Sequence, residues 1–85
     1  MPNETSSQPT FLAGLNVRAE MARRGVTQSR VGAWLGMAPS AVSHRLTGRT
    51  PLDINELVKI ADLLNVPLGR LLDGVGSDNS TAVTA

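Results

Sequence analysis

The sequence predicts a compact all-α domain of five helices. Apolar residues recur at spacings of three and four in five segments of the chain, and this period is typical of helices that bury one face. Residues that favour helix ends flank these segments, and no segment alternates apolar and polar residues as a strand would. The expected helices cover residues 11–24, 28–35, 39–47, 54–64 and 68–72, and no internal repeat is visible.

Composition divides the 85 residues into one domain and two tails. Residues 1–9 and 74–85 are rich in small polar residues and poor in large apolar ones, so we expect both tails to be disordered. Residues 10–73 form the expected domain, whose small core relies on tight helix packing or on a partner. The sequence has no cysteine, which excludes disulfides and thiolate metal sites. It shows no long apolar run and no signal-peptide pattern, so we expect a cytoplasmic protein.

The first expected helix covers residues 11–24. Thr10 is its candidate N-cap, and Gly25 follows its last turn, where a left-handed residue commonly ends a helix. Arg23 and Arg24 in the last turn suit the helix dipole. The expected buried face consists of Leu12, Leu15, Ala19 and Ala22, with Val17 and Met21 on an adjoining stripe.

Residues 27–48 predict two short helices joined by a tight turn. Thr27 is the candidate N-cap of the first helix, and Gly36 supplies the backbone freedom that the turn needs. Gly32 lies inside the first helix at a cost in helix stability, which predicts a close backbone approach by the second helix. Met37 is apolar within the turn, and we expect it to fill the space between the helices.

The second of these helices leaves one face free. Pro39 fits its first position, where the missing N–H is not needed, and Gly48 ends it. Val42 and Leu46 lie four residues apart and face inward, whereas the outward positions carry small polar groups and no acid. This arrangement is typical of a helix-turn-helix, which inserts its second helix into the major groove of DNA.

The last two helices begin at recognisable signals. Asp53 followed by Glu56 predicts a capping box at the start of helix 54–64. Asn65 is the candidate left-handed C-cap of that helix, and Pro67 opens the short helix 68–72. The expected buried stripe of the longer helix is Leu57, Ile60, Ala61 and Leu64.

Trp34 and one group of apolar residues each have more than one interpretation. Trp34, the sole tryptophan, packs over the first helix or the rim of the core, or it takes part in an interface. The group exceeds what one small core needs, and it belongs either to the core or to a two-fold patch between subunits. This group is Leu63, Leu68, Leu71, Leu72 and Val75.

The charges are segregated along the chain. Residues 11–50 carry six arginines against one glutamate, whereas residues 51–85 carry two basic and five acidic residues. A basic half predicts an anionic partner, for which nucleic acid is the commonest choice. A solvated arginine-rich surface without a partner is the alternative, and Arg18, Arg23 and Arg24 fit either interpretation.

Several motifs resemble one known family. They are TQ at the start of helix 28–35, LG at its end, SAVS in the next helix with a Gly after it, and ELVKIADLLNVPLGRLL across the last two helices. Together they resemble the phage-repressor or Cro-like helix-turn-helix family, often called XRE, over about residues 15–72. The resemblance implies a five-helix, lambda-repressor-like DNA-binding domain that acts as a homodimer on a palindromic operator.

The resemblance also implies which residues meet DNA. It places part of helix 39–47 nearest the base edges, and it gives Gln28 a phosphate contact at the amino end of its helix. From their position beside helix 39–47, we also expect its flanking arginines and the backbone N–H groups of Thr47 and Gly48 to contact phosphates. The expected base contacts are Pro39, Ser40, Ser43 and His44. The expected phosphate contacts are Gln28, Arg30, Arg45, Thr47 and Arg49.

Two features depart from the family's pattern. Arg45 stands where the family usually has an apolar residue, and Leu46 beside it takes the packing role. Pro39 and Ser40 stand where a Gln or Arg often reads a base. Serine hydroxyls discriminate weakly between bases, so we expect DNA shape to carry part of the specificity.

These observations predict a sequence-specific DNA-binding transcriptional regulator, a phage-type repressor that places helix 39–47 in the major groove of double-stranded DNA. Bound to DNA, it would associate with the nucleoid. No cofactor, small-molecule ligand or membrane is implied. The alternative is a helix-turn-helix module that binds a protein and not DNA.

Catalysis and metal binding find little support in the sequence. Ser40 and His44 lie four residues apart on one helix, but no carboxylate near them in sequence orients the histidine, so we do not expect an enzyme. One histidine and no cysteine argue against a metal site.

Overall fold

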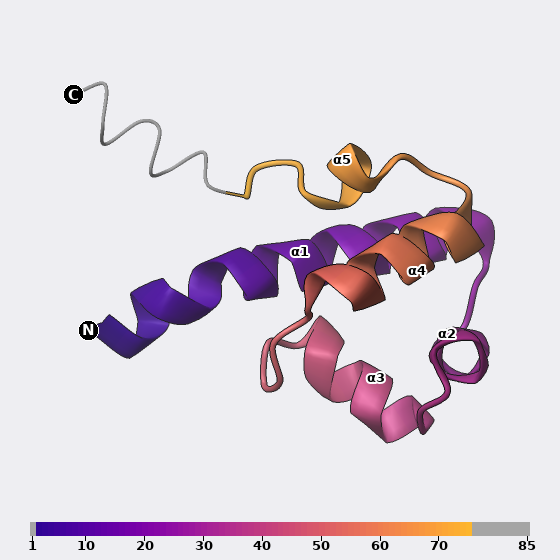
Figure 1. The fold of residues 1–85 in the computed structure, drawn as a ribbon, viewed down its shortest axis with the longest axis horizontal. Helices are drawn as coiled ribbons and strands as arrows, with labels where there is room; N and C mark the ends of the chain where they lie inside the picture. The colour runs from indigo at the N-terminus through magenta and orange to yellow at the C-terminus, as the bar shows by residue number, and fades with distance from the viewer. Residues whose placement is uncertain (1, 76–85) are drawn as a thin grey trace.

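The structure is a computed structural model that describes residues 2–75, with side-chain environments from Phe11 onward. Its helices are α1 (Pro2–Arg24), α2 (Gln28–Leu35), α3 (Pro39–Leu46), α4 (Ile54–Leu64) and α5 (Leu68–Leu71), and the described part contains no strand. In Figure 1, α1 runs along the middle of the molecule, with α5 above it and α3 below it. α1 packs against α3, α4 and α5, and α2 packs against α3 and α4. The predicted all-α fold of five helices is confirmed.

The first helix is longer than the sequence predicts. It begins at Pro2 and not at Phe11, and it continues through Pro9 and Thr10, so Thr10 is not an N-cap. A formed helix gains about one hydrogen bond for each non-proline residue that it adds, whereas starting a helix is costly, and this difference favours a helix that continues past Thr10 toward the amino end. The tail expected at residues 74–85 lies outside the described residues beyond Val75.

One face of each of the helices α1 to α4 contributes to the core. The predicted burial of Val31, Val42 and Leu46 in α2 and α3 is confirmed. The predicted stripe of α4 is buried in full, and Leu52 joins it from the loop before α4. Leu71 is fully buried, and its neighbours in the apolar excess are half-buried side chains that pack against the core. These neighbours are Leu63, Leu68, Leu72 and Val75.

The main predicted stripe of α1 is wrong, whereas the burial of Val17 and Met21 on the adjoining stripe is confirmed. The structure buries Ala13, Val17 and Met21 and leaves Leu15, Ala19 and Ala22 exposed. The buried side also contains Glu20, which is only 3% exposed. Because an ionisable residue interrupts this stripe, its apolar periodicity is weaker than that of the exposed stripe, and the sequence pattern does not identify it as the buried one.

Gly14 sets how closely α1 approaches α3. A Cβ atom at Gly14 would lie 2.6 Å from the carbonyl oxygen of Leu46 and 3.1 Å from that of Arg45. No side chain fits this gap, so the glycine lets the last turn of α3 rest directly on the α1 backbone.

Gly32 makes a second close approach, to a different partner than predicted. A Cβ atom there would lie 2.5 Å from the carbonyl oxygen of Met37. The expected contact with the second helix is therefore a contact with the turn that precedes it. The turn is also held by a hydrogen bond from the Met37 N–H to the Gly32 carbonyl at 2.9 Å.

The helix ends confirm most of the predicted signals. The Thr27 hydroxyl accepts a hydrogen bond from the Arg30 N–H, and Gly36 ends α2 with a left-handed φ of 74°. Asp53 and Glu56 form both halves of a capping box at the start of α4. Asn65 ends α4 with a left-handed φ of 58°.

Trp34 packs against a different helix than expected. Its indole N–H donates to the Lys59 carbonyl of α4 at 2.8 Å, and 49% of the residue stays exposed. Packing over α1 is therefore wrong, because α2 contacts α3 and α4 but not α1.

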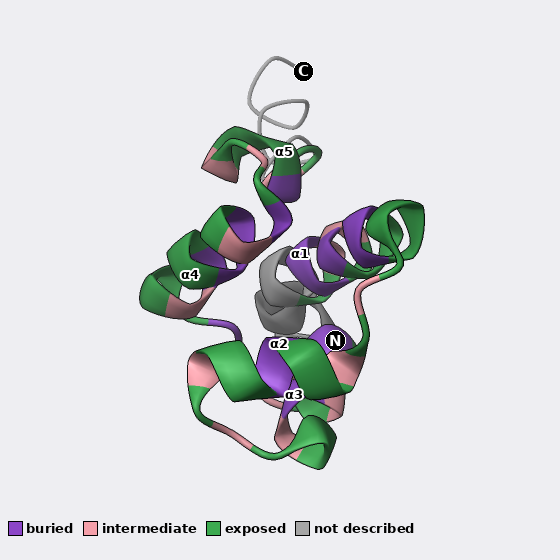
Figure 2. Cartoon of the chain, turned by 90° about the vertical axis from the view of Figure 1, so that its right-hand side faces the viewer, coloured by how far each residue is buried: buried purple, intermediate pink, exposed green. Residues whose placement is uncertain are grey.

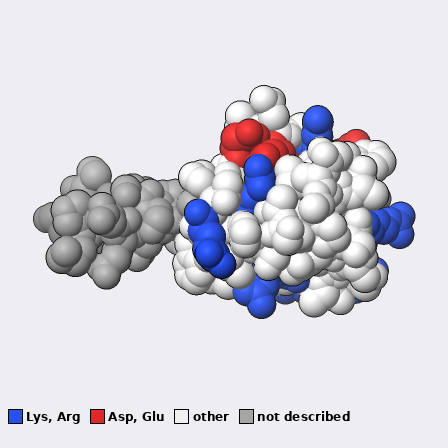
Figure 3. All heavy atoms as spheres, turned by 90° about the horizontal axis from the view of Figure 1, so that it is seen from below, with Lys and Arg blue, Asp and Glu red and all other residues white. Residues whose placement is uncertain are grey.

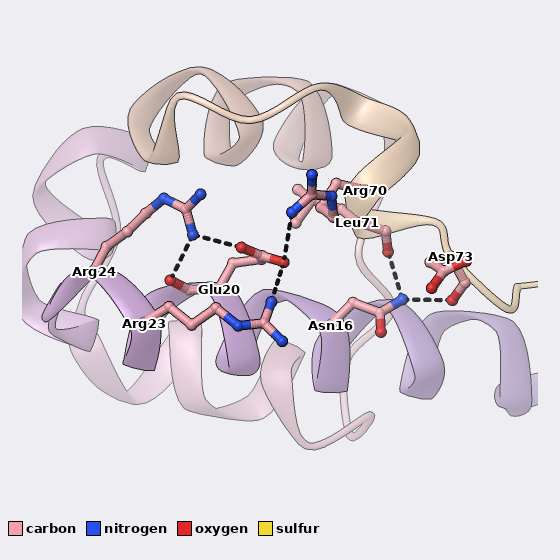
Figure 4. Close-up of polar contacts among 7 residues, drawn as sticks. All are labelled: Asn16, Glu20, Arg23, Arg24, Arg70, Leu71 and Asp73. Carbon is pink, nitrogen blue, oxygen red and sulfur yellow. Dashed lines mark hydrogen bonds and ion pairs between the residues drawn. The ribbon is translucent and has the colours of Figure 1, made fainter.

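A buried carboxylate joins α1 to α5. Glu20 pairs with Arg23 at 2.6 Å and with Arg24 at 2.5 Å, and Arg70 of α5 lies 3.7 Å from it (Figure 4). Burial of Glu20 raises its pKa, but the hydrogen bond from Arg24 and the three positive charges outweigh burial, so the net pKa is lowered. Asn16, one turn earlier, donates its amide N–H groups to the carbonyls of Leu71 and Asp73 at 2.9 and 2.7 Å.

Adding one methyl group at Gly14 tests the close approach of α1 and α3. Gly14→Ala should destabilise the protein by about 1–3 kcal/mol, because the new Cβ collides with backbone atoms that cannot rotate away. Gly69→Ala in α5 is the matched control, since a Cβ there meets nothing within 4 Å, and it should leave stability unchanged or raise it. Urea unfolding followed by circular dichroism measures both. Equal stability of the two variants would contradict the assigned contact.

Neutralising Glu20 tests the buried carboxylate. A carboxylate with a lowered folded pKa stabilises the fold above its unfolded pKa, and this stabilisation is lost as the pH falls through the folded pKa. Glu20→Gln should therefore be less stable than the wild type at pH 7, and the difference should shrink below the ordinary glutamate pKa of about 4.3. Asp62→Asn on the exposed side of α4 controls for the loss of one negative charge. A deficit in thermal stability that is the same at pH 7 and at pH 3 would contradict this role.

Candidate nucleic-acid interface

Three backbone features fix the start of α3. α2 ends at Gly36, the Met37 N–H closes the turn, and Pro39 occupies the first turn of α3. Val42 and Leu46 then anchor the inner side of α3 in the core. Because these contacts fix both the depth and the rotation of α3, they also determine which of its side chains point outward.

The outward side of α3 carries the expected base-contacting residues. Pro39, Ser40 and His44 are exposed, and Ser43 is half-buried. Figure 2 shows that α3 carries exposed residues beside its buried ones. The structure therefore brings all four to one open helix face. No acidic residue interrupts this region, because the sequence contains no Asp or Glu between Met21 and Leu52.

Backbone hydrogen bonds order the segment that follows α3. The N–H groups of Arg49 and Thr50 both donate to the His44 carbonyl, at 2.8 and 3.1 Å. Gly48 has a left-handed φ of 84°, and a Cβ there would lie 3.1 Å from the Phe11 ring. The Arg49 side chain is exposed on this ordered segment, next to the carboxyl end of α3.

Thr47 and Gly48 have fewer free donors than the sequence suggests. The Thr47 N–H and hydroxyl both donate to the Ser43 carbonyl, at 3.0 and 2.9 Å, and the Gly48 N–H donates to the Arg45 carbonyl at 3.4 Å. The backbone N–H groups proposed as phosphate ligands are therefore already used inside the chain. A phosphate contact of Thr47 stays a prediction.

Arg45 has a structural partner that sequence reasoning missed. Its Nε donates to Glu56 at 3.0 Å, and its Nη1 donates to the Ala41 carbonyl at 3.1 Å. The Arg45 side chain is only 21% exposed. Glu56 is the capping-box residue of α4, so this pair ties α3 to the start of α4. The capping motif identifies Glu56 in the sequence, but no local spacing links it to Arg45.

The remaining expected phosphate ligands lie on the surface. Gln28 is half-buried at the first residue of α2, and Arg30 is exposed two residues later. Seen from below in Figure 3, basic side chains lie around the edge of the α2–α3 face, and acidic ones gather at one margin. Of the arginines on α1, Arg23 and Arg24 are engaged with Glu20, and Arg18 is exposed.

Other kinds of site find no support in the part of the chain that is described. Residues 2–75 contain no group of three or more His, Cys, Asp or Glu side chains placed to hold a metal ion. None of the described helices is long and apolar enough to cross a membrane.

Comparison with known proteins identifies the domain. A family model described as a helix-turn-helix domain, of the XRE-like kind, matches residues 13–73. This match spans most of the described structure, from Ala13 in α1 to Asp73 just after α5. No curated protein and no solved structure matches the chain.

Truncating Arg45 separates its structural role from that of the exposed arginines. Arg45→Ala should lower the stability by about 1–2 kcal/mol, because it leaves Glu56 and the Ala41 carbonyl without their partner. Arg49→Ala and Arg30→Ala remove exposed guanidinium groups and should change the stability by less than about 0.5 kcal/mol. Thermal unfolding of the three variants compares them. The ion pair has no structural role if Arg45→Ala unfolds at the same temperature as Arg49→Ala.

Proposed function

The chain belongs to the XRE-like helix-turn-helix domain family, and we propose that it is a sequence-specific DNA-binding transcriptional regulator that acts as a phage-type repressor. The observation that carries this proposal is the open face of α3. Pro39, Ser40 and His44 are exposed together on a helix whose other side is fixed in the core. A helix held in this way can enter the major groove without changing its shape.

Specific readout falls mainly to His44. Its imidazole can donate a hydrogen bond to guanine N7 or O6, whereas Ser40 and Ser43 donate to or accept from any base. Pro39 can offer only an apolar contact, for example to a thymine methyl group. Since these contacts are few, the sequence-dependent shape of DNA supplies part of the specificity.

The phosphate contacts supply most of the affinity. Arg49 and Arg30 are exposed and carry charge at opposite ends of the α2–α3 region, and Gln28 presents the amino end of α2 to a phosphate. Arg45 contributes by position, because its pair with Glu56 keeps α3 and α4 together.

The proposed protein represses transcription by occupying its operator. A single domain has a limited contact area, so two copies bind two half-sites about one helical turn apart and block polymerase sterically. The short side chains of Ser40 and Ser43 favour a second candidate, a module that binds a protein through the same face.

Binding to DNA distinguishes the two functions. A gel shift at low salt with DNA of mixed sequence should show a complex whose affinity falls steeply as the salt concentration rises. Selection of bound sites from random DNA should then yield a palindromic consensus. His44→Ala should relax the preference at one or two base positions, at a cost of about 1 kcal/mol on the selected site alone.

Arg49→Ala should instead weaken binding to all sequences and reduce the salt slope by about one unit. Arg70→Ala, which removes a half-exposed arginine from α5, is the matched control and should leave the slope unchanged. The protein-interaction function replaces the proposal if the wild type binds no DNA at any salt concentration. The division of roles is wrong if His44→Ala and Arg49→Ala cause the same loss on every sequence.

A further inference from the structure

Phe11 is a large apolar side chain that the core does not use. It is 41% exposed, and it belongs neither to the buried cluster nor to the half-buried residues packed against that cluster. It contacts instead the segment that follows α3. A Cβ atom at Gly48 would lie 3.1 Å from the Cδ1 atom of Phe11 and 3.4 Å from its Cβ atom. The Phe11 side chain therefore fills the place that a side chain of residue 48 would take.

The segment 47–50 has little support of its own. None of its four residues is buried. Its closed shape depends on hydrogen bonds from the Arg49 and Thr50 N–H groups to the His44 carbonyl, at 2.8 and 3.1 Å. Hydrogen bonds near solvent, with few buried apolar contacts around them, open at a low cost in free energy. An apolar side chain packed on the segment raises that cost, because opening then exposes apolar surface to water.

The same hydrogen bonds connect the two kinds of proposed DNA contact. The proposed function gives base readout to His44 and a phosphate contact to the exposed Arg49. Since the Arg49 N–H is bonded to the His44 carbonyl, the backbone at Arg49 keeps a fixed position relative to α3 while the segment is closed. A backbone that is fixed before binding lowers the entropy cost of a phosphate contact.

α1 supports α3 and the segment after it through separate contacts. Gly14 receives the last turn of α3, whereas Phe11, three residues earlier, lies against Gly48. In Figure 1, the loop between α3 and α4 passes beneath α1. Because the Gly14 contact does not involve the Phe11 side chain, α3 can stay in place when that side chain is removed. The two contacts can therefore be tested separately.

We infer that Phe11 is a positioning residue for DNA binding. By packing against Gly48, it keeps the segment 47–50 closed, and the closed segment holds Arg49 at a fixed distance from the base-reading face of α3. Arg49 supplies the charge for the phosphate contact, and Phe11 supplies its position. The inference rests on the proposed function, and it adds to the DNA-binding site a residue of α1, outside the helix-turn-helix.

Amide hydrogen exchange of the full chain without DNA tests the contact. In Phe11→Ala, the Arg49 and Thr50 amides should exchange at least about tenfold faster than in the wild type, because their hydrogen bonds open more often. The buried part of α4 should change much less. Leu15→Ala is the matched control, because it truncates a side chain of similar exposure, 39%, one turn along α1, and it should leave these two amides unchanged.

Phe11→Leu provides the conservative variant. Leucine has carbons at the β and δ positions, which are the atoms of Phe11 nearest to Gly48, so slow exchange should return. The inference is overturned if Phe11→Ala leaves the Arg49 and Thr50 rates unchanged, or if Leu15→Ala accelerates them equally. It is also overturned if the amides of α4 accelerate by the same factor, because Phe11 then acts only through overall stability.

DNA binding, measured well below the unfolding temperature, tests the consequence. Phe11→Ala should weaken binding about threefold to tenfold on every sequence and reduce the salt slope by up to about one unit, in the same direction as Arg49→Ala. The base preference that depends on His44 should not change. Since both substitutions remove one contact, the double variant should bind no more weakly than Arg49→Ala alone. Leu15→Ala should bind as the wild type does.

The outcomes separate the inference from the proposed function. If the wild type binds DNA but the losses of Phe11→Ala and Arg49→Ala multiply in the double variant, the inference fails and the proposed function stands. Normal binding by Phe11→Ala has the same meaning. If the wild type binds no DNA, the proposed function fails, and the DNA role of Phe11 fails with it even when the exchange rates change as expected.

Discussion

The contact between the backbones of α1 and α3 is the constraint on which the rest of the structure depends. At Gly14, the carbonyl oxygen of Leu46 comes so close that a Cβ atom would lie 2.6 Å from it. This contact fixes the carboxyl end of α3, and the Gly32–Met37 contact fixes the turn before its amino end. A helix of eight residues is unstable alone, so its shape and its exposed face come from these two supports.

Electrostatic pairing divides the arginines into two groups. Arg23 and Arg24 pair with the carboxylate of Glu20 within α1, whereas Arg70 joins α5 to Glu20 and Arg45 joins α3 to Glu56 of α4. Arg30 and Arg49 stay exposed next to α2 and α3, where the chain has no acidic residue. Net charge alone cannot make this division, because every arginine carries the same charge in the sequence. Only partner geometry separates a structural arginine from one that is available to a ligand.

Local signals were sufficient for the ends of four helices and for the inner side of α3. The capping box at Asp53 and the left-handed residues Gly36 and Asn65 act within a few residues, so a sequence pattern contains all the information that they need. The buried side of α1 was not predictable in the same way, because α1 has two apolar stripes of similar period. The correct stripe includes Glu20, whose burial depends on arginines from α1 and from the distant α5. The Arg45–Glu56 pair and the contact of Trp34 with α4 were missed for the same reason, since both join separate helices.

The chemistry of the α3 face explains why the arrangement of copies matters for the proposed regulator. Two serines, one proline and one histidine can distinguish few bases, so a single domain finds many acceptable sites. Requiring two such faces at a fixed separation multiplies their modest preferences, and the spacing itself becomes part of the recognised sequence. That separation is rigid only if the surface between the copies is connected rigidly to α3. The contacts within the domain favour such rigidity, because Arg45 joins α3 to Glu56 at the start of α4 and Trp34 of α2 donates a hydrogen bond to the Lys59 carbonyl farther along α4.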